Sequence, residues 1–179
     1  NDLRWPFSFP VAKKSLLTWY LRHRRDLPWR TLWSQSGDPY VVWISEIMLQ
    51  QTVIKAVIPV YHRFLTKFPD LASFAAATEA EVREAVRGLG YYRRFGFMHK
   101  AARQLVAQGG HWPDTLAGWR ALPGVGDYTA AAVSSIAFGV AAAVVDGNVE
   151  RVFCRLLDLR CRQMILSSNQ SLKNSRASY

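Results

Sequence analysis

The sequence predicts an all-α fold, and three observations support this prediction. Apolar residues recur at helical spacing in most segments, helix-start signals precede several of these runs, and no segment alternates apolar and polar residues as a strand does. Half of the 179 residues are hydrophobic, which is a globular composition. The length allows one domain or two small lobes with a buried core.

The first helices are indicated by spacing and by capping. Apolar residues within 16–21 follow helical spacing. Asp38 is a favoured N-cap and Pro39 suits the first helical position, so another helix begins there. Because this helix is apolar nearly all round, we expect it to be buried. Residues 31–37, just before it, are expected to form a mobile loop.

The remaining elements follow from breakers and caps. A further helix runs to about Lys67, with an interruption or kink at Pro59. Residues 78–81 (Thr-Glu-Ala-Glu) have the form of a capping box, and the helix that they open ends near Gly88. Residues 160–179 have little apolar periodicity and are expected to be a linker or a frayed end. Later helices are predicted at 94–108, 115–121, 127–137 and 148–158.

The charge distribution favours a polyanionic partner. Lys and Arg number 23 against 13 acidic residues, which gives a net charge of +10. Most of the excess lies in residues 1–30 and 81–120, whereas residues 31–80 are slightly acidic. Two separated basic surfaces suit DNA, although a generally basic protein is the alternative.

Cysteine content and hydropathy exclude several classes of protein. Cys154 and Cys161 are the only cysteines, so the chain has no disulfide framework and no four-ligand metal set, and no metal site is predicted. Cys154 lies on an apolar helix and is interpreted as a core residue. No apolar run approaches the ~20 residues of a membrane span, so we expect no membrane partner.

A short glycine-containing segment, residues 122–126 (Leu-Pro-Gly-Val-Gly), lies between two predicted helices. Its glycines permit positive φ and leave the backbone N–H groups uncovered. Together with the N-terminus of the next helix, these N–H groups can bind a phosphate without reading sequence. A structural turn is the alternative, but the surrounding helices and the net charge favour a helix-hairpin-helix that binds DNA. The predicted DNA-backbone residues are Leu122, Gly124, Val125, Gly126 and Thr129.

Two carboxylates have contrasting predicted environments. Glu46 lies in the most apolar helix, where desolvation raises its pKa and suits it to general acid catalysis. The alternative is a glutamate on a narrow polar stripe with Ser45 and Gln50. Asp146 follows an apolar run at a helix start, where the carboxylate is stabilised as an anion, and an ordinary N-cap is the alternative. Such a pair can cleave a glycosidic bond through an oxocarbenium-like transition state.

Four motifs in order then reveal a resemblance. They are residues 45–52 (Ser-Glu-Ile-Met-Leu-Gln-Gln-Thr), 88–92 (Gly-Leu-Gly-Tyr-Tyr), 122–126 and 145–149 (Val-Asp-Gly-Asn-Val). From about Arg25 to Leu159 the chain resembles the MutY-type adenine DNA glycosylases of the endonuclease III-like superfamily. The resemblance implies a helix-hairpin-helix DNA glycosylase fold, with a six-helix barrel lobe at about 31–136. The N-terminal segment and 137–159 would contribute to an incomplete second lobe.

The resemblance also implies a reaction, the removal of adenine mispaired with 8-oxoguanine or guanine in double-stranded DNA. Glu46 matches the residue that protonates the adenine ring. Asp146 matches the carboxylate that stabilises the sugar cation, and Tyr128 and Asn148 match residues that assist it. The remaining matched positions concern binding: Gln51 and Tyr91 match side chains that enter the base stack, and Arg25, Trp29, Arg30 and Leu49 match positions that line the adenine pocket.

Position 128 separates relatives with different chemistry. Bifunctional endonuclease III-type enzymes have a lysine there, which forms a Schiff base and cleaves the strand. Tyr128 therefore favours a monofunctional glycosylase. Tyrosine also occurs there in thymine glycosylases that act on G·T mismatches, so this function stays an alternative, as does a non-catalytic DNA-binding fragment.

The resemblance ends near Leu159, and residues 160–179 do not match the family. The family continues with four cysteines that bind a [4Fe–4S] cluster and with a domain that recognises 8-oxoguanine. We expect both regions to be absent, so that the chain as given binds no cofactor and the cluster belongs to a longer form. We further expect a monomer, located in the bacterial cytoplasm at the nucleoid, or in the nucleus or mitochondrion of a eukaryote.

Overall fold

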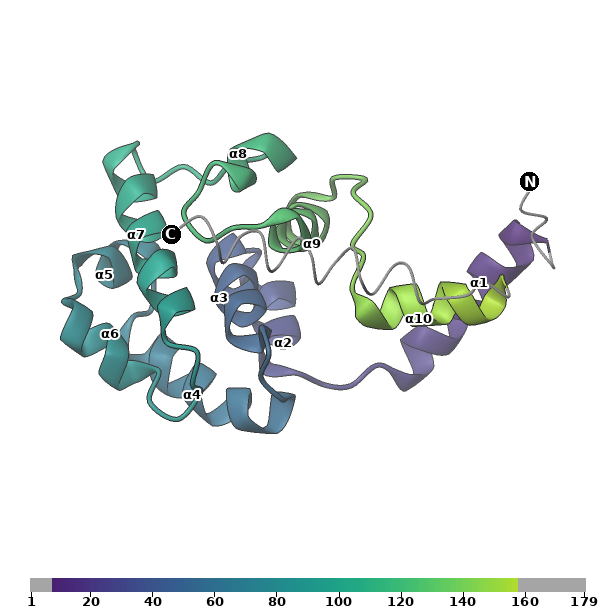
Figure 1. Cartoon of the computed structure of the whole chain (residues 1–179), viewed down its shortest axis with the longest axis horizontal. Helices are drawn as coiled ribbons and strands as arrows, with labels where there is room; N and C mark the ends of the chain where they lie inside the picture. Colours follow the sequence, from purple (N-terminus) through teal and green to yellow (C-terminus); the bar gives the residue numbers. More distant parts are fainter. Residues whose placement is uncertain (1–7, 158–179) are drawn as a thin grey trace. The chain divides into compact units, whose positions relative to one another are not determined.

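The computed structural model describes residues 8–157, and these residues form helices without any strand (Figure 1). The predicted all-α class is therefore confirmed. Within the described range, α2 to α9 belong to one compact unit, Asp26–Val144, whereas α1 and α10 belong to a second unit. The helices are α1 (Phe9–His23), α2 (Pro28–Ser36), α3 (Pro39–Leu49), α4 (Ile54–Lys67), α5 (Leu71–Ala76), α6 (Glu79–Ala85), α7 (Arg93–Ala107), α8 (Leu116–Arg120), α9 (Asp127–Phe138) and α10 (Gly147–Leu156).

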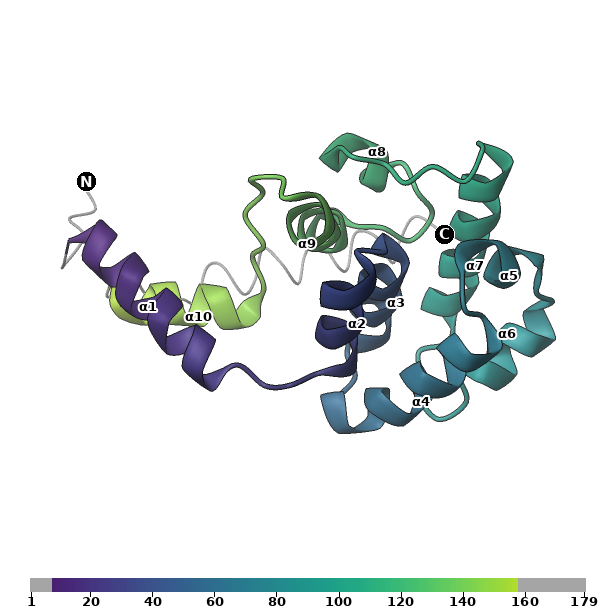
Figure 2. The same ribbon diagram turned by 180° about the vertical axis from the view of Figure 1, so that it is seen from behind.

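Helix α3 is the centre of the larger unit. It contacts α2, α4, α7 and α9, and Figure 2 shows it from behind between α2 and α7. The side chain of Asp38 caps it by accepting a hydrogen bond from the N–H of Tyr40 at 2.9 Å, and Pro39 occupies the first turn. Nearly all its side chains are buried, as its apolar sequence predicts.

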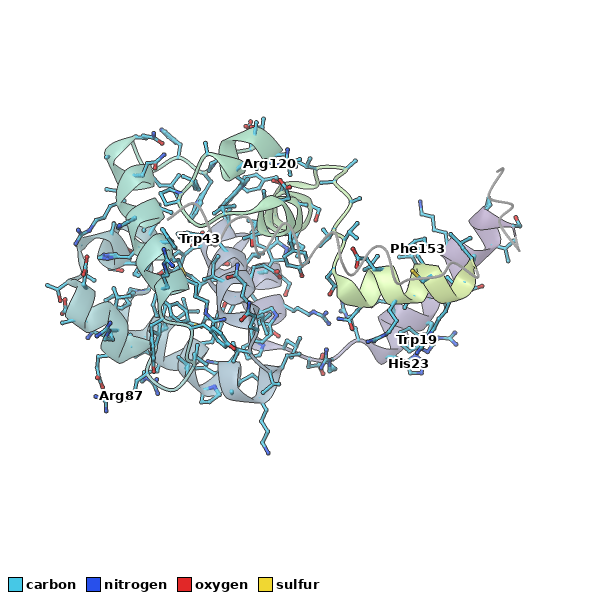
Figure 3. The ribbon with its side chains drawn as sticks, in the orientation of Figure 1. Trp19, His23, Trp43, Arg87, Arg120 and Phe153 are labelled. Atoms are coloured by element: carbon cyan, nitrogen blue, oxygen red, sulfur yellow. The ribbon has the colours of Figure 1, made fainter. Side chains whose placement is uncertain are left out.

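Aromatic side chains pack around α3. Trp43 lies edge-on to Trp112 at 5.6 Å between ring centroids, and Trp112 stacks on Trp119 at 5.6 Å. Trp43 is labelled inside the larger unit in Figure 3. The hydroxyl of Tyr61 donates to the carbonyl of Val41 at 3.0 Å, which fastens α4 to α3. Because large aromatic rings bury much apolar surface, these contacts contribute strongly to the stability of the core.

The capping box predicted at 78–81 is confirmed. The Thr78 N–H donates to the Glu81 carboxylate at 2.8 Å, and the Glu81 N–H donates to the Thr78 hydroxyl at 3.2 Å. A second box, between Asp70 and Ser73, opens the short helix α5, which the sequence analysis did not predict. Buried Phe74 holds α5 in the core. The later helices lie within two residues of their predicted bounds.

Two expectations about the backbone are wrong. Residues 31–37 are not a loop, because α2 covers Pro28–Ser36 and ends at Gly37 with φ +63°. Trp29 of α2 is buried, and Leu32 and Trp33 pack against the core. This packing stabilises the helix. Helix α4 is likewise continuous through Pro59, so the predicted interruption is wrong, whereas a kink there stays a prediction. The buried side chains of α4 compensate for the backbone hydrogen bond that proline cannot make.

In the smaller unit, α1 shows the helix expected around residues 16–21. Cys154 in α10 is buried, at 5% exposure. Among the described residues, no helix is long and apolar enough to cross a membrane. The expected tail at 160–179 lies outside the described residues.

Replacement of Pro59 by alanine should stabilise the larger unit. Pro59 is exposed and lies inside α4, so alanine would restore an N–H that can complete the helix without disturbing the core. We expect the free energy of unfolding to rise by about 2 kcal/mol, after allowance for the greater freedom of the unfolded chain. Denaturant unfolding measures this change, and an unchanged or lower midpoint would contradict it.

Candidate active site

Glu46 occupies the only partly exposed position in the middle of α3, between buried Ser45 and Ile47. Burial among apolar neighbours raises its pKa to about 7. The predicted direction of this shift is confirmed. The alternative, a narrow polar stripe with Ser45 and Gln50, is not favoured, because Ser45 is buried and its hydroxyl donates to the carbonyl of Val42 at 2.8 Å. A carboxyl with this pKa can carry a proton at neutral pH and release it.

Asp146 has the opposite environment, at the N-cap of α10. Its Oδ1 accepts the backbone N–H of Val149 at 2.8 Å and that of Asn148 at 3.0 Å. The Asn148 side chain donates to Oδ2 at 3.1 Å and accepts from Arg151 at 3.1 Å. The backbone N–H of Val149, together with the side-chain amide and the backbone N–H of Asn148, holds the pKa of Asp146 below its usual range. Asp146 is thus both an N-cap and a stabilised anion, and Asn148 orients it.

The predicted catalytic residues are divided between the two units. Glu46 and Tyr128, which is 40% exposed near the start of α9, belong to the larger unit. Asp146, Asn148 and the exposed Arg25 belong to the smaller one.

The candidate pocket residues of the larger unit differ in exposure. Trp29 is only 7% exposed, and its ring lies edge-on to Tyr61 at 5.4 Å. Arg30 and Leu49 are partly buried. Trp29 is therefore in the first place a core residue that holds α2, with little surface left for a ligand.

Two exposed side chains project from unusual backbone turns. Gln51, after the end of α3, has φ +55°, and Tyr91, before α7, has φ +46° and is 66% exposed. The side chain of Gln50 donates to the Thr129 hydroxyl at 3.1 Å, which links the first turn to α9. The sequence motifs indicate Gln51 and Tyr91, whereas no local pattern indicates this link, because it joins residues 79 positions apart.

The hairpin at 122–126 connects α8 to α9. Leu122 and Val125 point into the core, and Gly124 has φ +74°. A Cβ on Gly124 would lie 2.5 Å from the Cβ of Phe97, so only glycine fits there. Gly126 caps α9 without any side-chain hydrogen bond, which leaves the helix N-terminus open to an anion.

Two predicted backbone-binding groups in the hairpin already have partners. The N–H of Val125 donates to the Leu122 carbonyl at 3.2 Å. Thr129 is 2% exposed, and its hydroxyl accepts the bond from Gln50. A phosphate would therefore meet the N–H groups at the beginning of α9 rather than these side chains.

An ion pair spans the hairpin and was not predicted. The guanidinium of Arg120, labelled on α8 in Figure 3, lies 2.7 Å from the carboxylate of Asp127, the first residue of α9. The Asp127 side chain is 85% exposed. Two features of the sequence could have indicated this ion pair: an acidic residue in the first turn of α9 and a basic residue in the last turn of α8. A carboxylate at this helix end opposes anion binding nearby.

Residues 8–157 contain no group of three or more His, Cys, Asp or Glu that could hold a metal ion. The described residues therefore do not fit an iron–sulfur cluster. Cys161 lies outside them.

The comparison with known families identifies the chain. Residues 44–174 match the profile of the HhH-GPD superfamily base excision DNA repair protein. The match therefore extends beyond Leu159, so the expectation that residues 160–179 do not match the family is wrong for 160–174. The chain belongs to this superfamily. It is 48% identical to human adenine DNA glycosylase over 148 residues, which are 79% of this chain and 27% of the human protein. It is 38% identical to the adenine DNA glycosylase of Buchnera aphidicola subsp. Baizongia pistaciae over 147 residues, 81% of this chain and 41% of that protein.

Solved structures of the superfamily show the same fold. A thermostable thymine-DNA glycosylase matches with a TM-score of 0.72 and 34% identity, over 80% of this chain and 65% of that one. Endonuclease III in a non-covalent DNA complex matches with a TM-score of 0.60 and 32% identity, over 64% of this chain and 55% of that one. The predicted resemblance and the helix-hairpin-helix glycosylase fold are confirmed. The chain spans less than half the length of the two curated relatives described above.

The raised pKa of Glu46 should make stability depend on pH. The folded state holds this proton up to about pH 7, whereas an unfolded glutamate releases it near pH 4.5. Between these values the folded state binds more protons, so its stability falls as pH rises. Relative to Glu46→Gln, the wild type should lose about 3 kcal/mol of unfolding free energy between pH 4 and pH 8. Denaturant unfolding of both proteins tests this, and parallel pH profiles would rule it out.

Proposed function

We propose that this chain removes adenine mispaired with 8-oxoguanine or guanine from double-stranded DNA, without cleaving the strand. The observation that carries the proposal is Glu46, a carboxylic acid with a pKa of about 7 on the buried central helix. Support also comes from the 37–48% identity to adenine DNA glycosylases over about 80% of the chain.

The proposed reaction gives the two carboxylates different tasks. Glu46 donates its proton to a ring nitrogen of adenine, so that the base leaves as a neutral molecule with the electrons of the N-glycosidic bond. The anion of Asp146, oriented by Asn148, stabilises the positive charge that develops on the sugar. Water then bonds to the sugar carbon and loses a proton. Tyr128 has no amine that could form a Schiff base, which agrees with removal of the base without strand cleavage.

Binding in this proposal is separate from the chemistry. The open N-terminus of α9 holds a backbone phosphate, and Gln51 and Tyr91 enter the base stack as the adenine turns out. Arg30 and Leu49 of the larger unit and the exposed Arg25 of the smaller unit are the candidates for contact with the base, whereas Trp29 supports α2 from the core. A monomer acting at the nucleoid, or in the nucleus or mitochondrion, agrees with this function.

Thymine removal from G·T mismatches is the second candidate. It is favoured by one observation, the likeness to a thymine-DNA glycosylase at a TM-score of 0.72. The higher sequence identity to adenine DNA glycosylases favours adenine.

Single-turnover assays on matched duplexes test the proposal. The chain should release adenine opposite 8-oxoguanine, and Glu46→Gln should slow release by roughly 10²- to 10⁴-fold. Asp146→Asn should also reduce the rate while keeping the α10 cap, because asparagine is a good N-cap. Asp146→Ala removes both charge and cap, so comparison of the two variants by circular dichroism separates catalysis from folding.

The other outcomes of this assay are equally informative. Release of thymine from G·T but not of adenine would favour the second candidate. Salt-dependent binding without release from any mismatch would indicate a non-catalytic DNA-binding fragment. Adenine release that survives Glu46→Gln would exclude Glu46 as the acid.

Asp127→Asn should strengthen duplex binding. The change removes an exposed negative charge from the hairpin and leaves Arg120 able to contact a phosphate. We expect tighter binding of matched and mismatched duplexes alike, with the slope of log affinity against log salt steeper by about one. Glu79→Gln, on α6 outside the hairpin, makes the same charge change and should have a smaller effect. Equal effects of the two variants would argue against a local role of Asp127.

A further inference from the structure

Two turns of the larger unit hold non-glycine residues in the left-handed region. These residues are Gln51 and Tyr91, and among the described residues they are the only non-glycine positions with positive φ. Such a conformation costs of order 1 kcal/mol or more and persists only where surrounding contacts enforce it. Both side chains are exposed, so their own contacts do not explain the backbone.

Arg94 contacts both turns. Its backbone N–H donates to the carbonyl of Tyr91 at 3.2 Å. Its guanidinium Nη2 donates to the hydroxyl of Thr52, the residue after Gln51, at 2.8 Å. One residue therefore connects two turns that are about 40 positions apart in the sequence.

The guanidinium of Arg94 is held away from solvent. Its Nε and Nη1 have almost no exposed surface and no hydrogen-bond partner among the described residues. The group lies 4.6 Å from the ring centroid of Phe95. Burial of a charge with so few partners is unfavourable for stability. Stability alone therefore does not account for an arginine at this position, and the bond to Thr52 is the specific contact that it provides.

The turn that carries Gln51 is fastened on its other side as well. Gln50 donates to Thr129 on α9, and Thr52 accepts from Arg94 on α7. Gln51 thus stands between two residues whose side chains are fixed to different helices. Without Arg94, the turn would keep its local backbone bonds, and of these two side-chain bonds to other helices only that of Gln50 would remain.

We propose that Arg94 is a positioning residue that fixes Gln51 relative to Tyr91, so that the two side chains enter the base stack together. The inference rests on the proposed function, in which these side chains open the duplex. Arg94 acts on the opening of the base pair, through Thr52 and Tyr91, and does not touch the reacting atoms.

A fluorescent adenine analogue tests this role. 2-Aminopurine placed opposite 8-oxoguanine brightens when it leaves the base stack. Arg94→Met and Thr52→Val should each reduce the equilibrium for this opening roughly fivefold, the expected effect of one lost hydrogen bond. Both changes break the bond between Arg94 and Thr52, and Thr52→Val also removes the bond from the Thr52 hydroxyl to the Gln50 carbonyl at 3.3 Å. The double variant should therefore be no worse than Thr52→Val alone. Thr52→Val removes only a hydroxyl, and it tests the bond even if Arg94→Met fails to fold.

Two controls separate positioning from charge and from folding. Arg93→Met removes the same charge from the neighbouring position of α7 and should leave the opening unchanged once duplex binding is saturated. Arg94→Lys retains a charged donor and should recover part of the fluorescence change. Thermal unfolding of every variant shows whether the fold is intact.

Each alternative outcome has a separate meaning. Additive losses in the double variant, or normal opening in both single variants, would overturn the role of Arg94 alone. A wild type that binds the duplex without opening it and without releasing adenine would overturn the proposed function, and this inference with it.

Discussion

The structure depends on the burial of one helix, α3. It contacts four other helices. Because α3 is apolar on nearly every side, it buries more apolar surface than an amphipathic helix of the same length could. The same burial sets the chemistry of Glu46. A carboxyl on a surface helix would be ionised at neutral pH, whereas on α3 its pKa reaches about 7. The fold and the candidate acid thus have a single physical cause.

Local signals accounted for much of the fold. Asp38 before Pro39, and Thr78 before Glu81, act through hydrogen bonds to neighbours in the sequence, so their helices could be predicted. Helix α2 could not be predicted in the same way. Its sequence is rich in polar residues, and it depends on packing of Trp29 and its neighbours against the rest of the unit. Pro59 similarly remains helical because buried side chains on both sides of it hold α4 in place.

The candidate site was predictable where residue type alone decides the property. The opposite pKa directions of Glu46 and Asp146 follow from an apolar helix and from a helix N-cap, and both are readable in the sequence. The bonds from Gln50 to Thr129 and from Arg94 to Thr52 join distant segments, so no local pattern indicates them. The candidate residues of the site could therefore be predicted from the sequence, but the contacts that hold them in place could not.

The close approach of Gly124 to Phe97 has a consequence for how this sequence can change. A side chain at position 124 would collide with the Cβ of residue 97, an atom that every residue except glycine possesses. Substitution of Phe97 by a smaller residue therefore does not make room for one at 124. The hairpin and α7 cannot compensate for each other by ordinary exchanges of side-chain size. Position 124 is therefore restricted to glycine as long as residue 97 carries a side chain.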